Sequence, residues 1–299
     1  MKSIAIIGMG ALGLLYGDML QGTTNLGFIV DEGRRARYSR EPITVNGSPR
    51  TFALWSSGAA QRPADLLIFA VKGTALEQAM ADAAGYAGPD TILLSLLNGI
   101  TSEAILGERF GSEHIVYCTA QGMDAVREGR SLRYTQRGKL CIGLPGGRQS
   151  PDLEALRAIL DEAGVPYEVE ADILHRQWSK FMLNVGVNQV VMVHEGNYGT
   201  IQRPGEAREQ MIAAMKEVIP LANLEGIPVG EADLRYYVDL LDTLSPEGMP
   251  SMRQDGLAHR RSEVELFAGA VLKLAAKHGV DAPVNAWLYQ KVREMEARY

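Results

Sequence analysis

The chain has 299 residues and a formal net charge of −6, with 46% hydrophobic and 22% charged residues. This length predicts two domains, and the composition is that of a globular protein with enough apolar material for two cores. The negative net charge gives no electrostatic reason to bind nucleic acid or an anionic membrane. The apolar runs are too short to span a bilayer, and two cysteines, Cys118 and Cys141, make no disulfide framework, so we expect a reduced, cytoplasmic protein.

Short, β-branched apolar runs alternate with helical patterns in residues 1–170. Strands are expected at residues 4–7, 28–30, 66–71, 92–97, 115–117, 139–143 and 165–169. Helical or loop stretches such as residues 74–84 lie between them, and a helix over 152–163 is expected to end at Gly164 as its C-cap. Strands that alternate with helices predict an α/β domain with a parallel sheet.

Long helical patterns dominate residues 171–299. They cover residues 173–193, 207–226, 231–244, 251–278 and 284–297, with prolines near the breaks. We therefore expect an all-α C-terminal domain after the α/β domain. Apolar helical faces such as residues 264–274 fit either a core or a dimer interface, so the sequence leaves open whether the protein is a homodimer.

A glycine-rich loop follows the first predicted strand directly. Its residues are Gly8, Met9, Gly10, Ala11, Leu12 and Gly13, with the GxGxxG spacing of a dinucleotide-binding loop. The first glycine permits a tight turn, the second lets the backbone approach the pyrophosphate, and the third allows close packing of helix on strand. The following helix offers its N-terminal N–H groups to the phosphates. This context predicts a Rossmann-type, NAD(P)-binding domain; the alternative is a glycine turn without a ligand.

The end of the second predicted strand gives conflicting indications about the cofactor. Asp31 lies 18 residues beyond Gly13, close to the spacing of the carboxylate that binds the ribose 2′-hydroxyl of NAD. Arg34, Arg35 and Arg37 lie near enough to bind the additional phosphate of NADP. A third interpretation is that these residues are only solvated charges.

Two polar residues follow other predicted strands, where open α/β sheets bind their ligands. Lys72 could meet a phosphate or a substrate carboxylate, and Asn98 could bind the nicotinamide ribose or a substrate oxygen. The alternatives are a surface lysine and a turn residue in Asn98-Gly99.

The helical region contains a polar row in an apolar helix. Lys180, Asn184 and Asn188 are four residues apart, which places them on one helix face, directed at a ligand or at solvent. Further along, Ser251 with Gln254 fits a capping box, and Glu263 could form a surface ion pair. The five histidines have no metal-ligand spacing, so no metal site is expected.

With these motifs in this order, the chain resembles the ketopantoate reductase family over nearly its whole length. The shared features are the glycine loop, Val71-Lys72, Asn98-Gly99, Trp178-x-Lys180-x-x-x-Asn184-x-x-x-Asn188, Ser251-Met-x-Gln-Asp255 with Ser262-Glu263, and Gly279 to Asn285. The resemblance implies that NADPH reduces 2-dehydropantoate, a 2-keto acid, to pantoate for pantothenate and coenzyme A synthesis.

The same resemblance implies roles for individual residues. Lys180 would be the general acid, and Glu263 would support that lysine and the substrate. The implied substrate contacts are Asn98, Asn184, Asn188 and Ser251. The implied cofactor contacts are Gly8, Met9, Gly10, Ala11, Leu12, Gly13, Arg34, Lys72, Asn98 and Glu263.

One departure from the family pattern concerns the cofactor. Glu32 stands where the family usually carries an arginine for the 2′-phosphate. NADP(H) is the family expectation, with Arg34 or Arg35 replacing the missing contact, and NAD(H) is the alternative. Other interpretations of the chain are a reductase of a different 2-keto acid and a non-catalytic nucleotide-binding regulator. The segment 251–263 argues against a third, a β-hydroxyacid dehydrogenase.

Overall fold

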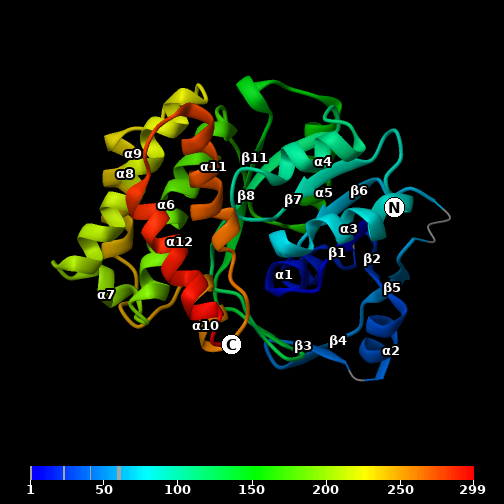
Figure 1. The fold of residues 1–299 in the computed structure, drawn as a ribbon. Helices are drawn as coiled ribbons and strands as arrows, with labels where there is room; N and C mark the ends of the chain where they lie inside the picture. The colour runs from blue at the N-terminus through cyan, green and yellow to red at the C-terminus, as the bar shows by residue number, and fades with distance from the viewer. Residues whose placement is uncertain (1, 23, 41, 59–61) are drawn as a thin grey trace. The chain divides into compact units, whose positions relative to one another are not determined.

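The computed structural model describes residues 2–22, 24–40, 42–58 and 62–299 (Figure 1). They form two compact units. The first comprises Met1–Leu97 and Thr101–Ile173, and the second comprises Asn98–Ile100 and Leu174–Tyr299. The short segment Asn98–Ile100 therefore belongs with the C-terminal helices, although the chain on both sides of it belongs to the first unit.

The first unit is built on an eight-stranded sheet of order β12-β11-β8-β7-β6-β1-β2-β5. Its strands are β1 (Ser3–Ile7), β2 (Asn25–Val30), β5 (Ala53–Ser56), β6 (Leu66–Phe69), β7 (Ile92–Ser95), β8 (Ile115–Met123), β11 (Arg137–Gly143) and β12 (Tyr167–Val169). All neighbouring pairs are parallel except β8 with β11, which is antiparallel. The predicted α/β class with a mainly parallel sheet is confirmed.

Apolar residues on both faces explain why the central strands are buried. In β1, Ile4 and Ile6 face one core while Ala5 and Ile7 face another, because successive side chains of a strand point to opposite sides. Helices cover both faces, so a continuous apolar run is the expected signature. The helices of this unit are α1 (Ala11–Leu20), α2 (Glu32–Arg40), α3 (Leu76–Ala83), α4 (Ser102–Phe110) and α5 (Pro151–Ala163).

The structure contains elements that the sequence did not predict. A second, four-stranded sheet has the order β4-β3-β10-β9, with β3 (Ile43–Val45), β4 (Ser48–Arg50), β9 (Val126–Glu128) and β10 (Ser131–Arg133). Each strand has three residues, too few to show a period, and β3 pairs with β10 from a distant part of the chain. Helix α5 was predicted, and Gly164 ends it in the left-handed conformation, as expected of a C-cap.

The second unit is helical, as predicted. It contains α6 (Ile173–Val193), α7 (Tyr198–Gln202), α8 (Glu206–Leu224), α9 (Glu231–Asp242), α10 (Ser251–Leu257), α11 (Ala268–His278) and α12 (Pro283–Glu296). Figure 1 shows the long helix α6 running among the other helices of this unit. Gly186 of α6 permits this packing, because a Cβ atom there would come within 2.5 Å of the Met215 side chain on α8.

One predicted helix, over residues 251–278, is wrong. The chain leaves α10 at Leu257, turns at His259 with a positive φ of 48°, and makes a 3₁₀ turn before α11. Ser262 stabilises the break, since its backbone N–H and its hydroxyl both donate to Oε1 of Glu296, at 2.7 and 2.6 Å. The break places Glu263 in the connection and not on a helix.

The apolar side chains of Val264, Phe267 and Val271 are buried in the core of the helical unit, so they are core residues and not a dimer surface.

Within the described part of the chain, no helix combines the length and apolar character that a membrane crossing requires.

Candidate active site

The glycine loop has the backbone geometry that its spacing predicts. Gly8 adopts a positive φ of 108°, and a Cβ atom there would overlap the Ala70 carbonyl after β6. A Cβ atom at Gly13, in the first turn of α1, would overlap the carbonyl oxygen of Gly8. These two glycines are thus required by the protein itself, because strand, turn and helix approach one another too closely for a side chain.

Gly10 differs from its two neighbours in the motif. Its φ and ψ, −72° and −169°, are open to any residue, and a Cβ atom there would lie 3.7 Å from the nearest protein atom outside its neighbours, the Ala70 oxygen. Packing within the protein therefore gives no reason for glycine. Gly10 is also the N-cap of α1 and has no side chain to bond the first helical N–H groups. An open surface with available N–H donors fits the pyrophosphate of a dinucleotide.

The charges after β2 lie on a helix and not in a loop. Asp31 precedes α2, and its Oδ1 accepts a 2.7 Å hydrogen bond from the Arg34 backbone N–H, while its Oδ2 lies 3.4 Å from the Arg34 guanidinium. Arg35 donates a 2.7 Å hydrogen bond to the Ser56 hydroxyl at the end of β5. Arginine and carboxylate side chains therefore lie close together at the start of α2, directly after β2. Lys72 follows β6, as predicted, although β6 ends at Phe69 and not at residue 71, and it directly precedes a 3₁₀ turn.

The polar row of α6 belongs to a hydrogen-bonded group within the helical unit. Nζ of Lys180 donates to Oδ1 of Asn98 at 3.3 Å, and Nδ2 of Asn98 donates to Oε2 of Glu263 at 3.2 Å. All three side chains are half-buried. Residues from three distant parts of the sequence thus meet, with Asn98 between the cation and the carboxylate.

The row continues along α6 with neutral amides. Nδ2 of Asn188 donates to Oδ1 of Asn184 at 3.3 Å, and the Ser251 hydroxyl lies 3.5 Å from Oδ1 of Asn188. The predicted capping box at Ser251 is wrong, because Pro250 is the N-cap of α10 and makes no side-chain cap. Ser251 instead directs its hydroxyl to α6. An ammonium beside several amide and hydroxyl groups can bind the carboxylate and oxygen atoms of a small anion.

A buried network of amide side chains, also involving α6, was not predicted from the sequence. Gln189 and Asn285 are both fully buried, and Nε2 of Gln189 donates to Oδ1 of Asn285 at 3.2 Å. Asn285 also donates to the Ala214 carbonyl and to Glu217, while Oε1 of Gln189 accepts from the Ala268 N–H. The network joins α6, α8, α11 and α12 and holds α6 in place. The sequence feature that could have predicted it is the presence of two amide side chains, Gln189 and Asn285, at positions where the helices are otherwise apolar.

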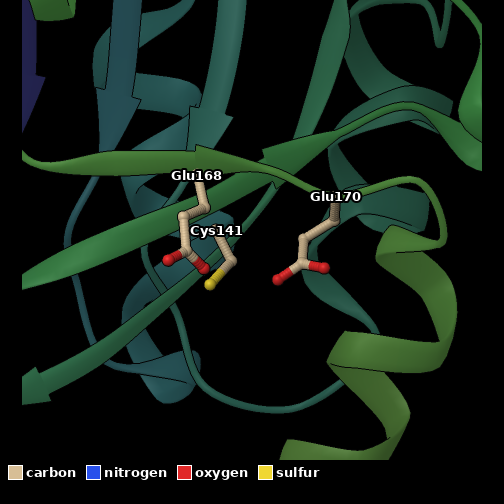
Figure 2. A group of neighbouring side chains, drawn as sticks. All are labelled: Cys141, Glu168 and Glu170. Carbon is tan, nitrogen blue, oxygen red and sulfur yellow. The ribbon is translucent and has the colours of Figure 1, made fainter.

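One group of possible metal ligands lies in the first unit. Cys141 is on β11, Glu168 is on β12, and Glu170 directly follows β12. Figure 2 shows the Cys141 thiol and the carboxylates of Glu168 and Glu170, whose ligand atoms lie within 4.8 Å of one another. Oε1 of Glu168 is 2.5 Å from Nζ of Lys139, so a lysine already neutralises that carboxylate. We assign no metal site here.

Comparison with known proteins gives consistent matches over the whole chain. Two family models, described as Ketopantoate reductase PanE/ApbA and its C-terminal part, match residues 4–147 and 172–296. The 2-dehydropantoate 2-reductase of Halobacterium salinarum is 27% identical over 300 residues, covering 97% of each chain. A ternary complex of D-mandelate dehydrogenase with NADH and anilino(oxo)acetate has a TM-score of 0.86 and 24% identity, covering 99% and 98%. A dimeric ketopantoate reductase from Staphylococcus aureus has a TM-score of 0.83 and 20% identity, covering 99% of each.

Proposed function

Since its two family models together span most of the chain, the protein belongs to the ketopantoate reductase family, and we propose that it reduces 2-dehydropantoate to pantoate. The observation that carries the proposal is the group around Lys180, in which one ammonium is held beside Asn98 and in line with Asn184, Asn188 and Ser251. A 2-keto acid offers a carboxylate and a ketone oxygen, and these donors match both.

The chemistry assigned to Lys180 follows from its charge. When bound, the nicotinamide cofactor supplies a hydride to the ketone carbon, and negative charge develops on the ketone oxygen. The Lys180 ammonium stabilises that charge and transfers a proton to the oxygen, which completes the hydroxyl group. Glu263, linked to Lys180 through Asn98, keeps the lysine oriented. Asn184, Asn188 and Ser251 orient the keto acid without adding charge.

For the cofactor we propose NADP(H), held at the pyrophosphate by the glycine loop and α1. Arg34 and Lys72 are the proposed cofactor contacts outside the loop, with Asn98 and Glu263 as further ones. The exposed Arg34 guanidinium lies 3.4 Å from the Asp31 carboxylate, so a 2′-phosphate could take the guanidinium from that carboxylate. Arg35 stands next to it as a second cation.

A second candidate is an NADH-dependent reductase of another 2-keto acid. Asp31 and Glu32 are the observations that favour it, because a carboxylate after the second strand suits a free ribose 2′-hydroxyl and repels a phosphate. The similar fold of D-mandelate dehydrogenase, which was solved with NADH and anilino(oxo)acetate, is consistent with such a substrate.

The test is the change in absorbance at 340 nm with ketopantoate, run in parallel with NADPH and NADH. We expect turnover by the wild type and a loss of about 10²–10⁴-fold in kcat for Lys180→Ala, the usual contribution of a general acid. Lys216→Ala, which removes an exposed lysine from α8, is the matched control and should retain full activity. No reduction of ketopantoate with either cofactor, together with turnover of an aromatic 2-keto acid, would favour the second candidate.

We also propose a homodimer, as in the dimeric Staphylococcus aureus relative. Light scattering coupled to size-exclusion chromatography would give the mass, and a particle of one chain would contradict the proposal.

A further inference from the structure

Helix α2 lacks the apolar face that normally attaches a helix to its domain. None of its nine residues is buried, and four of them are arginines: Arg34, Arg35, Arg37 and Arg40. Residues of α2 line a cavity of about 530 Å³ together with Ile43, Phe52 and Leu54, and Tyr38 packs partly against the apolar core. A helix that is polar all round needs other contacts to hold it.

Besides the hydrogen bond from Arg35 to Ser56 of β5, contacts come from the inserted β9–β10 hairpin, through Tyr38. The guanidinium groups of Arg37, Arg127 and Arg130 lie 5.0, 5.7 and 5.6 Å from the centre of the Tyr38 ring. Arg127 also donates a 3.2 Å hydrogen bond to the Tyr38 hydroxyl, and Arg130 donates to the Arg37 carbonyl. Burial raises the pKa of Tyr38, but the hydrogen bonds and charges of Arg127 and Arg37 outweigh it and leave the pKa below its ordinary value.

Arg127 touches the glycine loop at the same time. Its Nη1 donates to the carbonyl oxygen of Met9, and its Nε donates to the Gly129 carbonyl at 2.9 Å, which fixes the guanidinium plane. The Met9 carbonyl and the Gly10 N–H belong to one planar trans peptide and point in opposite directions. Holding the oxygen on one side therefore directs the Gly10 N–H to the other side, where a phosphate would bind.

We propose that Arg127 is a positioning residue for the dinucleotide cofactor, because it fixes the Met9–Gly10 peptide and α2 together. The inference rests on the proposed cofactor binding and adds to it a residue 118 positions from Met9 in the sequence. Arg127 sets the direction of the Gly10 N–H, which would donate to the pyrophosphate. Through Tyr38 it also holds α2, whose arginines would contact the adenosine end of the cofactor. One guanidinium with five donors can make all these contacts, whereas a lysine can make only part of them.

The test measures cofactor affinity and needs no keto acid. Fluorescence titration gives Kd for NADPH and NADH with the wild type, Arg127→Gln, Arg127→Lys and Tyr38→Phe. The control, Arg133→Gln, removes an equal charge from an exposed position of the same small sheet. We expect Kd for both cofactors to rise at least about tenfold in Arg127→Gln and less in Arg127→Lys. Tyr38→Phe should alter the NADPH-to-NADH preference and leave the NADH Kd nearly unchanged, since it removes the hydroxyl contact between Arg127 and α2 but leaves the hydrogen bond from Arg127 to Met9 in place.

The outcomes separate positioning from general stability. An Arg127→Gln protein that binds both cofactors as tightly as Arg133→Gln would overturn the proposal. If Arg127→Gln loses thermal stability, Arg127→Lys decides the matter: stability restored with cofactor affinity still reduced supports positioning, and full recovery of both overturns it. A wild type that binds neither cofactor would refute the proposed function itself.

Discussion

Replacing Gly10 with alanine adds one methyl group at the second position of the glycine loop. The structure gives that methyl group room, since the nearest protein atom outside the neighbouring residues would be 3.7 Å away and the backbone angles suit alanine. Alanine is a poorer N-cap than glycine but also restricts the unfolded chain, so the two effects on the free energy of unfolding nearly cancel, to within about 1 kcal/mol. The methyl group instead occupies the surface where the pyrophosphate would lie. We expect Kd for the cofactor to rise at least about tenfold, or ~1.4 kcal/mol.

Gly13→Ala is the matched variant, because the same methyl group there would overlap the Gly8 carbonyl. Overpacking of this kind costs roughly 1–3 kcal/mol, which lowers Tm by about 2–4 °C for each kcal/mol in a domain of this size. Thermal unfolding and cofactor titration of both variants measure the two effects. Gly10→Ala should bind the cofactor more weakly and keep the wild-type Tm, whereas Gly13→Ala should have a lower Tm. Wild-type affinity in Gly10→Ala would refute the reasoning and leave the loop a structural turn.

Three further predictions concern the scaffold. Asn285→Ala should lower the free energy of unfolding by about 1–3 kcal/mol in a urea titration, since it removes hydrogen-bond partners of the buried Gln189 and of the half-buried Glu217, whereas Gln290→Ala on the exposed face of α12 should change little. The bidentate hydrogen bonds of Arg208, at 2.7 and 2.8 Å, lower the pKa of Asp242, so the pair stabilises the fold above about pH 4 and this stability is lost as the pH falls through the lower folded-state pKa. Asp242→Asn should therefore cost up to about 1 kcal/mol at pH 7 and nothing in strong acid; an equal cost at both would contradict the assignment. Dialysis against a chelator should leave activity and Tm unchanged, and loss of either would point to a metal at Cys141, Glu168 and Glu170.

The sequence by itself determined the parts of this protein that depend on local pattern. Two-sided apolar runs predicted the central strands, helical periodicity predicted α6 over Ile173–Val193, and Gly164 predicted the end of α5. The glycine loop was recognisable because its three glycines and the strand and helix on either side of it are consecutive in the chain. The row of Lys180, Asn184 and Asn188 was predictable for the same reason, since spacing on a helix fixes a shared face.

Only the tertiary structure decided which distant residues meet. The three-residue strands of the small sheet have no readable period, and pairing between β3 and β10 forms them. The break after α10 depends on the hydrogen bonds that Ser262 donates to Glu296, 34 positions further along the chain, and no local sequence pattern marks it. Arg127 looks like a solvated charge in the sequence, yet the fold brings it to Met9 and Tyr38 at once. Long-range contacts of this kind leave no periodic trace in the chain, because each partner is specified only by where the folded backbone places it.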